Sequence, residues 1–75
     1  MDNEEKSVVF VLRFFGMDAS KESVHSSLAK AIVNAGKTDN WMRHHTRWIK
    51  AGDGVWKCKS AQNDAVIVRR TVDED

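Results

Sequence analysis

Basic side chains are concentrated in the second half of the sequence, at positions where they could contact phosphate groups. Between Trp41 and Arg70 there are two acids and seven basic residues, which are Arg43, Arg47, Lys50, Lys57, Lys59, Arg69 and Arg70. Lysine and arginine side chains donate to phosphate oxygens, and arginine also donates to base edges in nucleic acids. The sequence predicts these seven residues as the binding residues.

The distribution of charge separates a basic body from acidic ends. The net charge of the 75 residues is +1, but residues 6–72 hold all twelve Lys and Arg residues and five acids, a formal charge of +7. Such a body can meet phosphates or an acidic protein surface. The alternative is that the basic residues only solvate exposed faces, with Lys57 and Lys59 protecting the edge of a strand.

Three segments have the composition of strands. Residues 7–15 are rich in β-branched and aromatic residues and end at Gly16. Residues 55–60 alternate between apolar and basic side chains, and residues 65–72 are again β-branched. We therefore predict three strands, the last two joined as an antiparallel hairpin by a loop around residues 61–64.

Between the first strand and the hairpin, apolar residues recur at helical spacing. A first helix capped by Ser20 and stopped at Gly36 would bury one stripe, made of Val24, Leu28, Ala31, Ile32 and Ala35. A second helix capped by Thr38 or Asp39 would bury another, made of Trp41, Met42, His45, Trp48 and Ile49. The opposite side of that second helix would carry Arg43, Arg47 and Lys50.

These elements predict a small α+β domain over residues 7–72, in the order β-α-α-β-β. About three strands would form a sheet with both helices on one face. Residues 1–6 are expected to be a disordered acidic tail and residues 73–75 a second acidic tail. The layout resembles that of winged-helix proteins and of small phage Cro-like repressors. The resemblance implies that the second helix enters the major groove while the hairpin follows the DNA backbone.

The chemistry of the remaining residues does not predict catalysis, a cofactor or a metal. A chain of 75 residues has little room for a deep substrate pocket. Zinc would need ligands among His25, His44, His45 and Cys58, but adjacent His44 and His45 would point about 100° apart on a helix. Cys58 shares a strand face with Trp56 and is expected to be a small buried side chain. We therefore expect a non-enzymatic protein without a small-molecule substrate.

The predicted function is that of a small regulatory protein, typical of bacteria or phages, that binds nucleic acid as a transcription regulator does. The alternative is a phage-type inhibitor of a larger host protein, such as RNA polymerase or another nucleic-acid enzyme. Its anchors would be Trp56, Phe14 or Phe15, and the pair Arg69–Arg70. Since the chain has a single cysteine and no apolar run that could span a bilayer, we expect a cytoplasmic location and no membrane partner.

Overall fold

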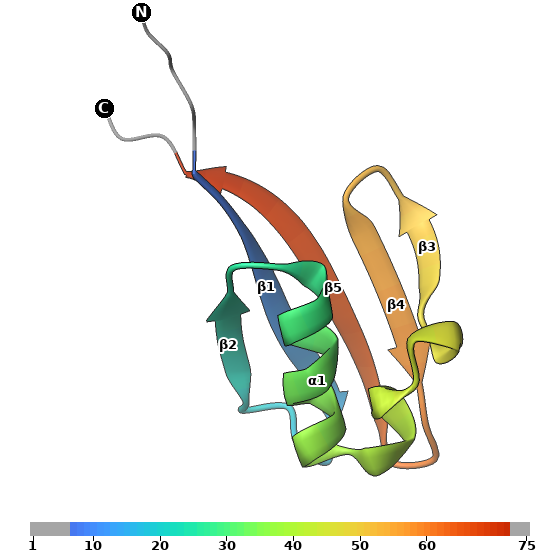
Figure 1. Cartoon of the computed structure of the whole chain (residues 1–75). Helices are drawn as coiled ribbons and strands as arrows, with labels where there is room; N and C mark the ends of the chain where they lie inside the picture. Colours follow the sequence, from blue (N-terminus) through green and yellow to red (C-terminus); the bar gives the residue numbers. More distant parts are fainter. Residues whose placement is uncertain (1–6, 73–75) are drawn as a thin grey trace, which may run out of the picture.

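The chain forms a five-stranded antiparallel sheet with one α-helix, in a computed structural model that describes residues 7–72 (Figure 1). The acidic segments 1–6 and 73–75 lie outside the described residues. The sheet has the strand order β2-β1-β5-β4-β3. The elements in chain order are β1 (Ser7–Gly16), β2 (Glu22–His25), α1 (Leu28–Thr38), the 3-10 helices η1 (Asn40–Arg43) and η2 (His45–Arg47), β3 (Ile49–Gly52), β4 (Val55–Lys59) and β5 (Asn63–Val72).

The two long strands β1 and β5 form the centre of the sheet. They pair over their whole length, from Ser7 opposite Val72 to Gly16 opposite Asn63. Because side chains alternate between the two faces of a strand, every second residue points to the same side. The face that carries the buried residues Leu12, Phe14, Cys58, Ala65 and Ile67 is called the inner face below, and the opposite side is the outer face.

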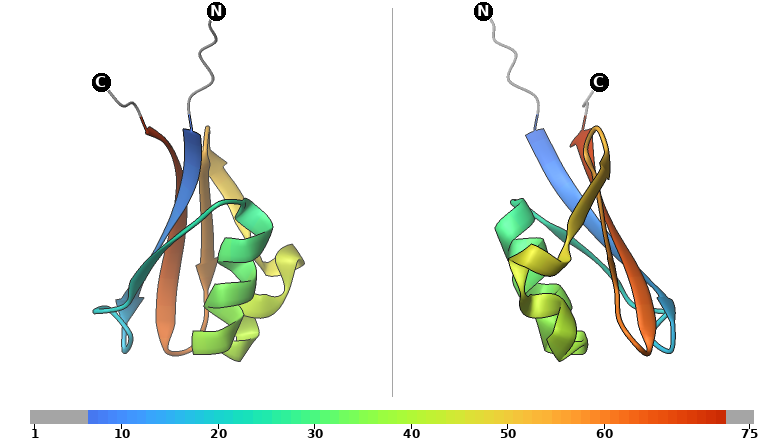
Figure 2. Two further views of the ribbon diagram at one scale, coloured as in Figure 1. Left: turned by 60° about the vertical axis from the view of Figure 1, so that its left-hand side comes forward. Right: turned by 90° about the vertical axis from the view of Figure 1, so that its right-hand side faces the viewer.

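The helix α1 covers the inner face. Its first turn is capped by Ser27, whose hydroxyl accepts a hydrogen bond from the backbone N–H of Lys30 at 3.1 Å. Its apolar stripe, which consists of Ala31, Ile32 and Ala35, is buried. Figure 2 shows α1 and the 3-10 turns together on one side of the sheet. Burial of each large apolar side chain in this layer contributes about 1.5–3 kcal/mol to stability.

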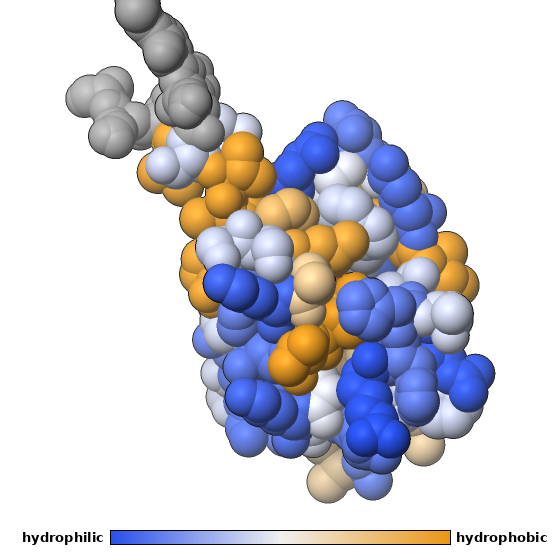
Figure 3. Space-filling model, viewed as in Figure 1, coloured by the Kyte–Doolittle hydropathy of each residue, from blue (hydrophilic) through white to orange (hydrophobic). Residues whose placement is uncertain are grey.

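One end of the inner face extends past the helix. In Figure 3, which views the molecule from the helix side, hydrophobic residues gather where β1 and β5 run beyond α1. Val8 is 42% exposed there, while Phe10 and Trp56 are partly buried, with ring centroids 5.9 Å apart. The aromatic pair therefore closes the end of the core that α1 does not reach.

The predicted architecture of three strands and two helices in the order β-α-α-β-β is wrong. The structure is mostly sheet, so the description α+β fits only in part. The expected start of the first helix at Ser20 is also wrong, because Glu22–His25 form strand β2, which pairs with residues 10–13 of β1. Pairing with the free edge of β1 satisfies the backbone of this segment, and the helix begins seven residues later, after Ser27.

The predicted second helix does not form. The segment instead makes the short 3-10 helices η1 and η2 and then enters β3, a strand that the sequence did not predict. Tryptophan, histidine and threonine, which fill this segment, are weak helix formers. Met42 and Trp48 are buried, and the indole Nε1–H of Trp48 donates to the carbonyl oxygen of Met42 at 2.8 Å. Tertiary burial of these two side chains thus overrides the helical spacing.

Within residues 7–72, no helix is long and apolar enough to cross a membrane. The longest one, α1, has 11 residues. This is well short of the roughly 20 apolar residues that a membrane-spanning helix requires.

Candidate binding groove

The outer face of the sheet presents its side chains in two parallel rows. One row runs from Phe15 on β1 through Asp64 on β5 to Lys59 on β4. The next row runs through the neighbouring outward positions, which are Arg13, Val66, Lys57 and Ile49. Since the rows are two residues apart, about 7 Å separates them along each strand. Figure 2 shows α1 on the other side of the sheet. The side chains of both rows are exposed, except Val66, which is half-buried.

A groove of about 910 Å³ lies over these rows. Its floor includes Phe15, Asp64 and Val66, the lysines of β4 and the exposed residue Ile49. Its wall is formed by the segment that links α1 to β3, through Trp41, Thr46 and Arg47. Strand β3 pairs with β4 up to Lys57, so this wall stands where the edge of β4 continues beyond β3.

Trp41 and Arg47 form a stacked pair in the wall. The guanidinium carbon of Arg47 lies 3.7 Å from the centre of the Trp41 ring, which is a cation–π contact. Trp41 is nevertheless 45% exposed. An arginine in such a contact can still donate from its N–H groups to an anion. With Lys57 and Lys59 on the floor, the groove holds three basic side chains against the acid Asp64.

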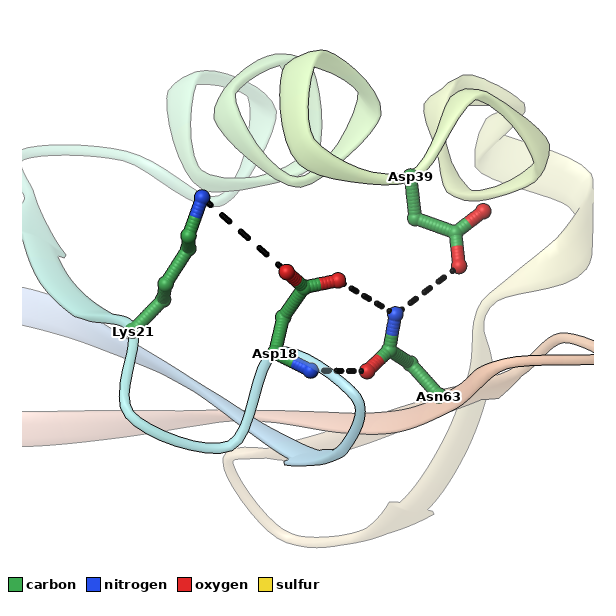
Figure 4. Close-up of polar contacts among 4 residues, drawn as sticks. All are labelled: Asp18, Lys21, Asp39 and Asn63. Atoms are coloured by element: carbon green, nitrogen blue, oxygen red, sulfur yellow. Dashed lines mark hydrogen bonds and ion pairs between the residues drawn. The ribbon is translucent and has the colours of Figure 1, made fainter.

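A buried polar network fixes the wall to the sheet (Figure 4). The side-chain amide of Asn63, which is 3% exposed, donates to Asp18 Oδ2 at 2.9 Å and to Asp39 Oδ2 at 3.3 Å. Its carbonyl oxygen accepts from the backbone N–H of Asp18 at 2.9 Å. Lys21 lies 4.0 Å from the other oxygen of Asp18. One amide therefore ties the loop after β1, the start of η1 and the first residue of β5 together.

Asp39 connects this network to the groove. Its Oδ1 accepts from the backbone N–H of Trp41 at 3.2 Å, which caps η1. Its Oδ2 also accepts from the hydroxyl of Ser60 in the β4–β5 turn. Because the carboxylate is held from both sides, the backbone that carries Trp41 is positioned relative to β4 and β5, which form the floor.

The structure brings three of the seven predicted binding residues together. Arg47, Lys57 and Lys59 line the groove. Arg70 shares the outer face but lies four residues farther along β5 than Val66, which is about 13 Å. It is therefore on the same surface but outside the groove.

The other three predicted residues point elsewhere. Lys50 lies opposite Trp56 in the strand register, on the inner side. Arg69 lies opposite Phe10 on the same inner side, and its guanidinium is 3.4 Å from the carboxylate of Asp53. Arg43 is exposed at the end of η1. The common basic helix side predicted for Arg43, Arg47 and Lys50 does not exist, because the helix does not form.

The prediction that Trp41 and Ile49 belong to a buried stripe is wrong, because both are exposed in the groove. The signal for Phe15 was present in the sequence. Strict alternation in β1 places Phe14 and Phe15 on opposite faces, and they are 2% and 50% exposed. Of the proposed aromatic anchors for a protein partner, Phe15 is therefore exposed, Phe14 is buried and Trp56 is partly buried.

The histidines and the cysteine do not converge. In the part of the chain that the structure describes, no three His, Cys, Asp or Glu side chains are placed to hold a metal ion. Burial raises the pKa of the Cys58 thiol and outweighs a backbone hydrogen bond at Lys59, which lowers it; the charges of Asp39 and Arg47 have smaller, opposite effects. Burial lowers the pKa of His25, whose Nε2 lies 2.7 Å from the hydroxyl of Ser23. Both groups are therefore favoured in their neutral forms.

Comparison of the chain with protein-family models, with curated proteins and with solved structures finds no match.

Proposed function

We propose that this protein is a small, non-enzymatic regulatory protein that binds nucleic acid through the groove on the outer face of its sheet. The observation that carries the proposal is the composition of that groove. It combines three basic side chains, from Arg47, Lys57 and Lys59, with the exposed aromatic rings of Trp41 and Phe15. A basic groove with accessible aromatic rings is the surface that proteins use to hold nucleic-acid backbones and bases.

The charge around the groove favours a polyanion over a single small anion. Arg13 lies in the same cross-strand row as Lys57, and Arg70 is farther along the same face. Arg13 is partly offset by Glu22, whose carboxylate is 3.8 Å away, and both side chains are more than half exposed. A bound strand would extend the contact from the groove toward Arg13 and release counterions at each phosphate that it neutralises.

The proposal differs in its binding mode from the recognition helix that the sequence suggested. The segment that holds Arg43 and Arg47 consists of 3-10 turns, which cannot present a continuous helix to the major groove. A sheet face reads nucleic acid by a different route, through side chains that stand upright from the strands.

The test is a salt series of fluorescence anisotropy measurements with labelled nucleic acid, comparing two double variants. Lys57→Ala with Lys59→Ala removes two charges from the groove. Lys30→Ala with Lys37→Ala removes the same charge from exposed positions of α1, on the other side of the sheet. We expect the groove variant to lose about tenfold or more in affinity at low salt. Its log–log salt slope should fall by about 1.5, while the α1 variant should stay near the parent protein.

Equal losses in the two variants would show that only net charge matters and would refute the groove as the site. No binding to DNA or RNA at about 50 mM salt would refute the proposed function itself. Circular dichroism of each variant confirms that the sheet is retained.

A second candidate function has its own support on the same face. The outer face also carries aliphatic residues that no described helix covers, with Val24 59% and Ile49 69% exposed. Such a face suits a regulator that binds and inhibits a larger protein. Binding of this kind would depend little on salt, which separates it from contact with phosphates. In either case, the single, buried Cys58 is consistent with action in the cytoplasm.

A further inference from the structure

We infer that the groove takes single-stranded nucleic acid, with unstacked bases against Trp41 and Phe15 and successive phosphates near Lys57 and Lys59. This inference rests on the proposed function and adds the class of strand that the site selects. It follows from the position of the aromatic rings, the spacing of the lysines and the volume of the groove.

The two aromatic rings lie at opposite sides of the groove. Phe15 extends from β1, while Trp41 belongs to the wall beyond the edge of β4. Their exposed fractions are 50% and 45%, so both rings have surface that a ligand can reach. A duplex keeps its bases stacked inside the helix and offers no π-face to such rings. A single strand offers one at every nucleotide.

The Trp41 ring is prepared for stacking before any ligand arrives. Its backbone N–H is held by Asp39, which is itself held by Asn63, and one face of the ring is covered by the Arg47 guanidinium. A base that lies against the exposed part of the ring would therefore meet an indole whose position and electrostatic environment are already set. Ordering that ring costs little on binding, which favours affinity.

The lysines have the spacing of an extended strand. Lys57 and Lys59 are two residues apart on the outer side of β4, which places their Cα atoms about 7 Å apart. This is close to the separation of successive phosphates along an extended single strand. The intervening residue, Cys58, points to the inner face and is buried, so both lysines reach the same side.

The volume and shape of the groove agree with a short stretch of single strand. About 910 Å³ is room for more than one nucleotide, and the groove is bounded by the wall at Thr46 and Arg47. A single strand whose backbone runs along β4 can direct its bases across the sheet, toward Phe15 on one side of the groove and Trp41 on the other.

The experiment compares an eight-nucleotide oligothymidylate with a twelve-base-pair duplex, by anisotropy and by intrinsic tryptophan fluorescence, at low salt. Oligothymidylate is chosen because it forms no structure of its own. We expect it to bind more tightly than the duplex and to quench the tryptophan emission. Trp41→Ala should weaken its binding by about 5- to 100-fold and abolish most of the quenching. Trp41→Phe, which keeps an aromatic ring, should retain affinity within a few-fold.

Phe15→Ala provides an independent variant on the other side of the groove, with the same expected direction of change. Val33→Ala, an exposed position on α1, is the matched control and should bind as the parent does. Equal or tighter binding of the duplex, or unchanged binding by Trp41→Ala, would overturn the single-strand inference. If binding still depends on Lys57 and Lys59, the proposed function would survive that result. Failure of both probes to bind would refute both conclusions.

Discussion

Replacement of Asn63 by Ala should destabilise the protein strongly. The change removes an amide that is 3% exposed and makes three hydrogen bonds, two of them to the carboxylates of Asp18 and Asp39. A hydrogen bond to a charged group contributes about 1.5–3 kcal/mol, and a buried carboxylate that loses a donor costs about as much. Water can replace part of this at Asp18, which is only half-buried. We therefore expect a loss of about 2–4 kcal/mol in the free energy of unfolding.

This loss is large for a domain whose total stability is about 5–10 kcal/mol. Urea unfolding followed by tryptophan fluorescence would measure it as a lower midpoint with an unchanged m-value. Gln62→Ala is the matched control, because Gln62 is the exposed neighbour and its hydrogen bonds run through its backbone. It should change stability by less than about 0.5 kcal/mol. A loss below about 1 kcal/mol for Asn63→Ala would refute the reasoning that this amide holds the loop, η1 and β5 together.

Three further variants or measurements follow from local contacts. Gly36→Ala should lower the free energy of unfolding by about 1–3 kcal/mol, because the added Cβ would collide with the side chain of Arg43. The same change normally stabilises a helix. A higher urea midpoint for this variant would contradict the expected collision. Cys58 should react with an aromatic disulfide reagent at least about 100-fold more slowly in the native protein than in urea, because burial raises the pKa of the thiol and blocks access to it. Rapid labelling of the native protein would contradict this expectation. Because burial lowers the pKa of His25 below 6.5, the unfolded chain takes up a proton first as the pH falls, so stability should decrease from about pH 7.5 to 5.5. His25→Gln should flatten that decrease in the urea midpoint, and an unchanged pH dependence would show that other groups cause it.

The strands that could be predicted are those whose own residue types have a high propensity for strands. β-Branched and aromatic residues dominate β1 and β5, and the structure places strands over Ser7–Gly16 and Asn63–Val72. The alternation in β4 is equally local. β2 and β3 are four residues long, and each becomes a strand by pairing with a longer neighbour. Such edge strands depend on a partner distant in the sequence, so their own residues carry little signal.

The errors in the helices have the same origin. The stripe from Trp41 to Ile49 has helical spacing, but its members divide between the core and the groove. Met42 and Trp48 are fully or nearly buried, whereas Trp41 and Ile49 are exposed. Spacing reports which side chains could share a helix face, and it assumes that the backbone is helical. Here Asp39 caps a 3-10 turn, and its carboxylate is held by Ser60 of the β4–β5 turn and by Asn63 of β5, which a local pattern cannot reveal.

The lysines of the candidate groove could be predicted from the sequence, but the side chains that lie beside them could not, because these depend on how the strands pair. Lys57 and Lys59 were predicted to share one strand face, and they do. Strand β5 pairs with both β1 and β4, and this pairing brings Phe15, Asp64 and Lys59 into one row. The pairing therefore decides that an aromatic ring lies on the same face as the lysines. A shift of one residue in that register would turn Phe15 toward the helix and Phe14 to solvent. The groove therefore depends on the same alternation that buries Leu12 and Phe14, and a substitution that weakens this core should also disorder the binding surface.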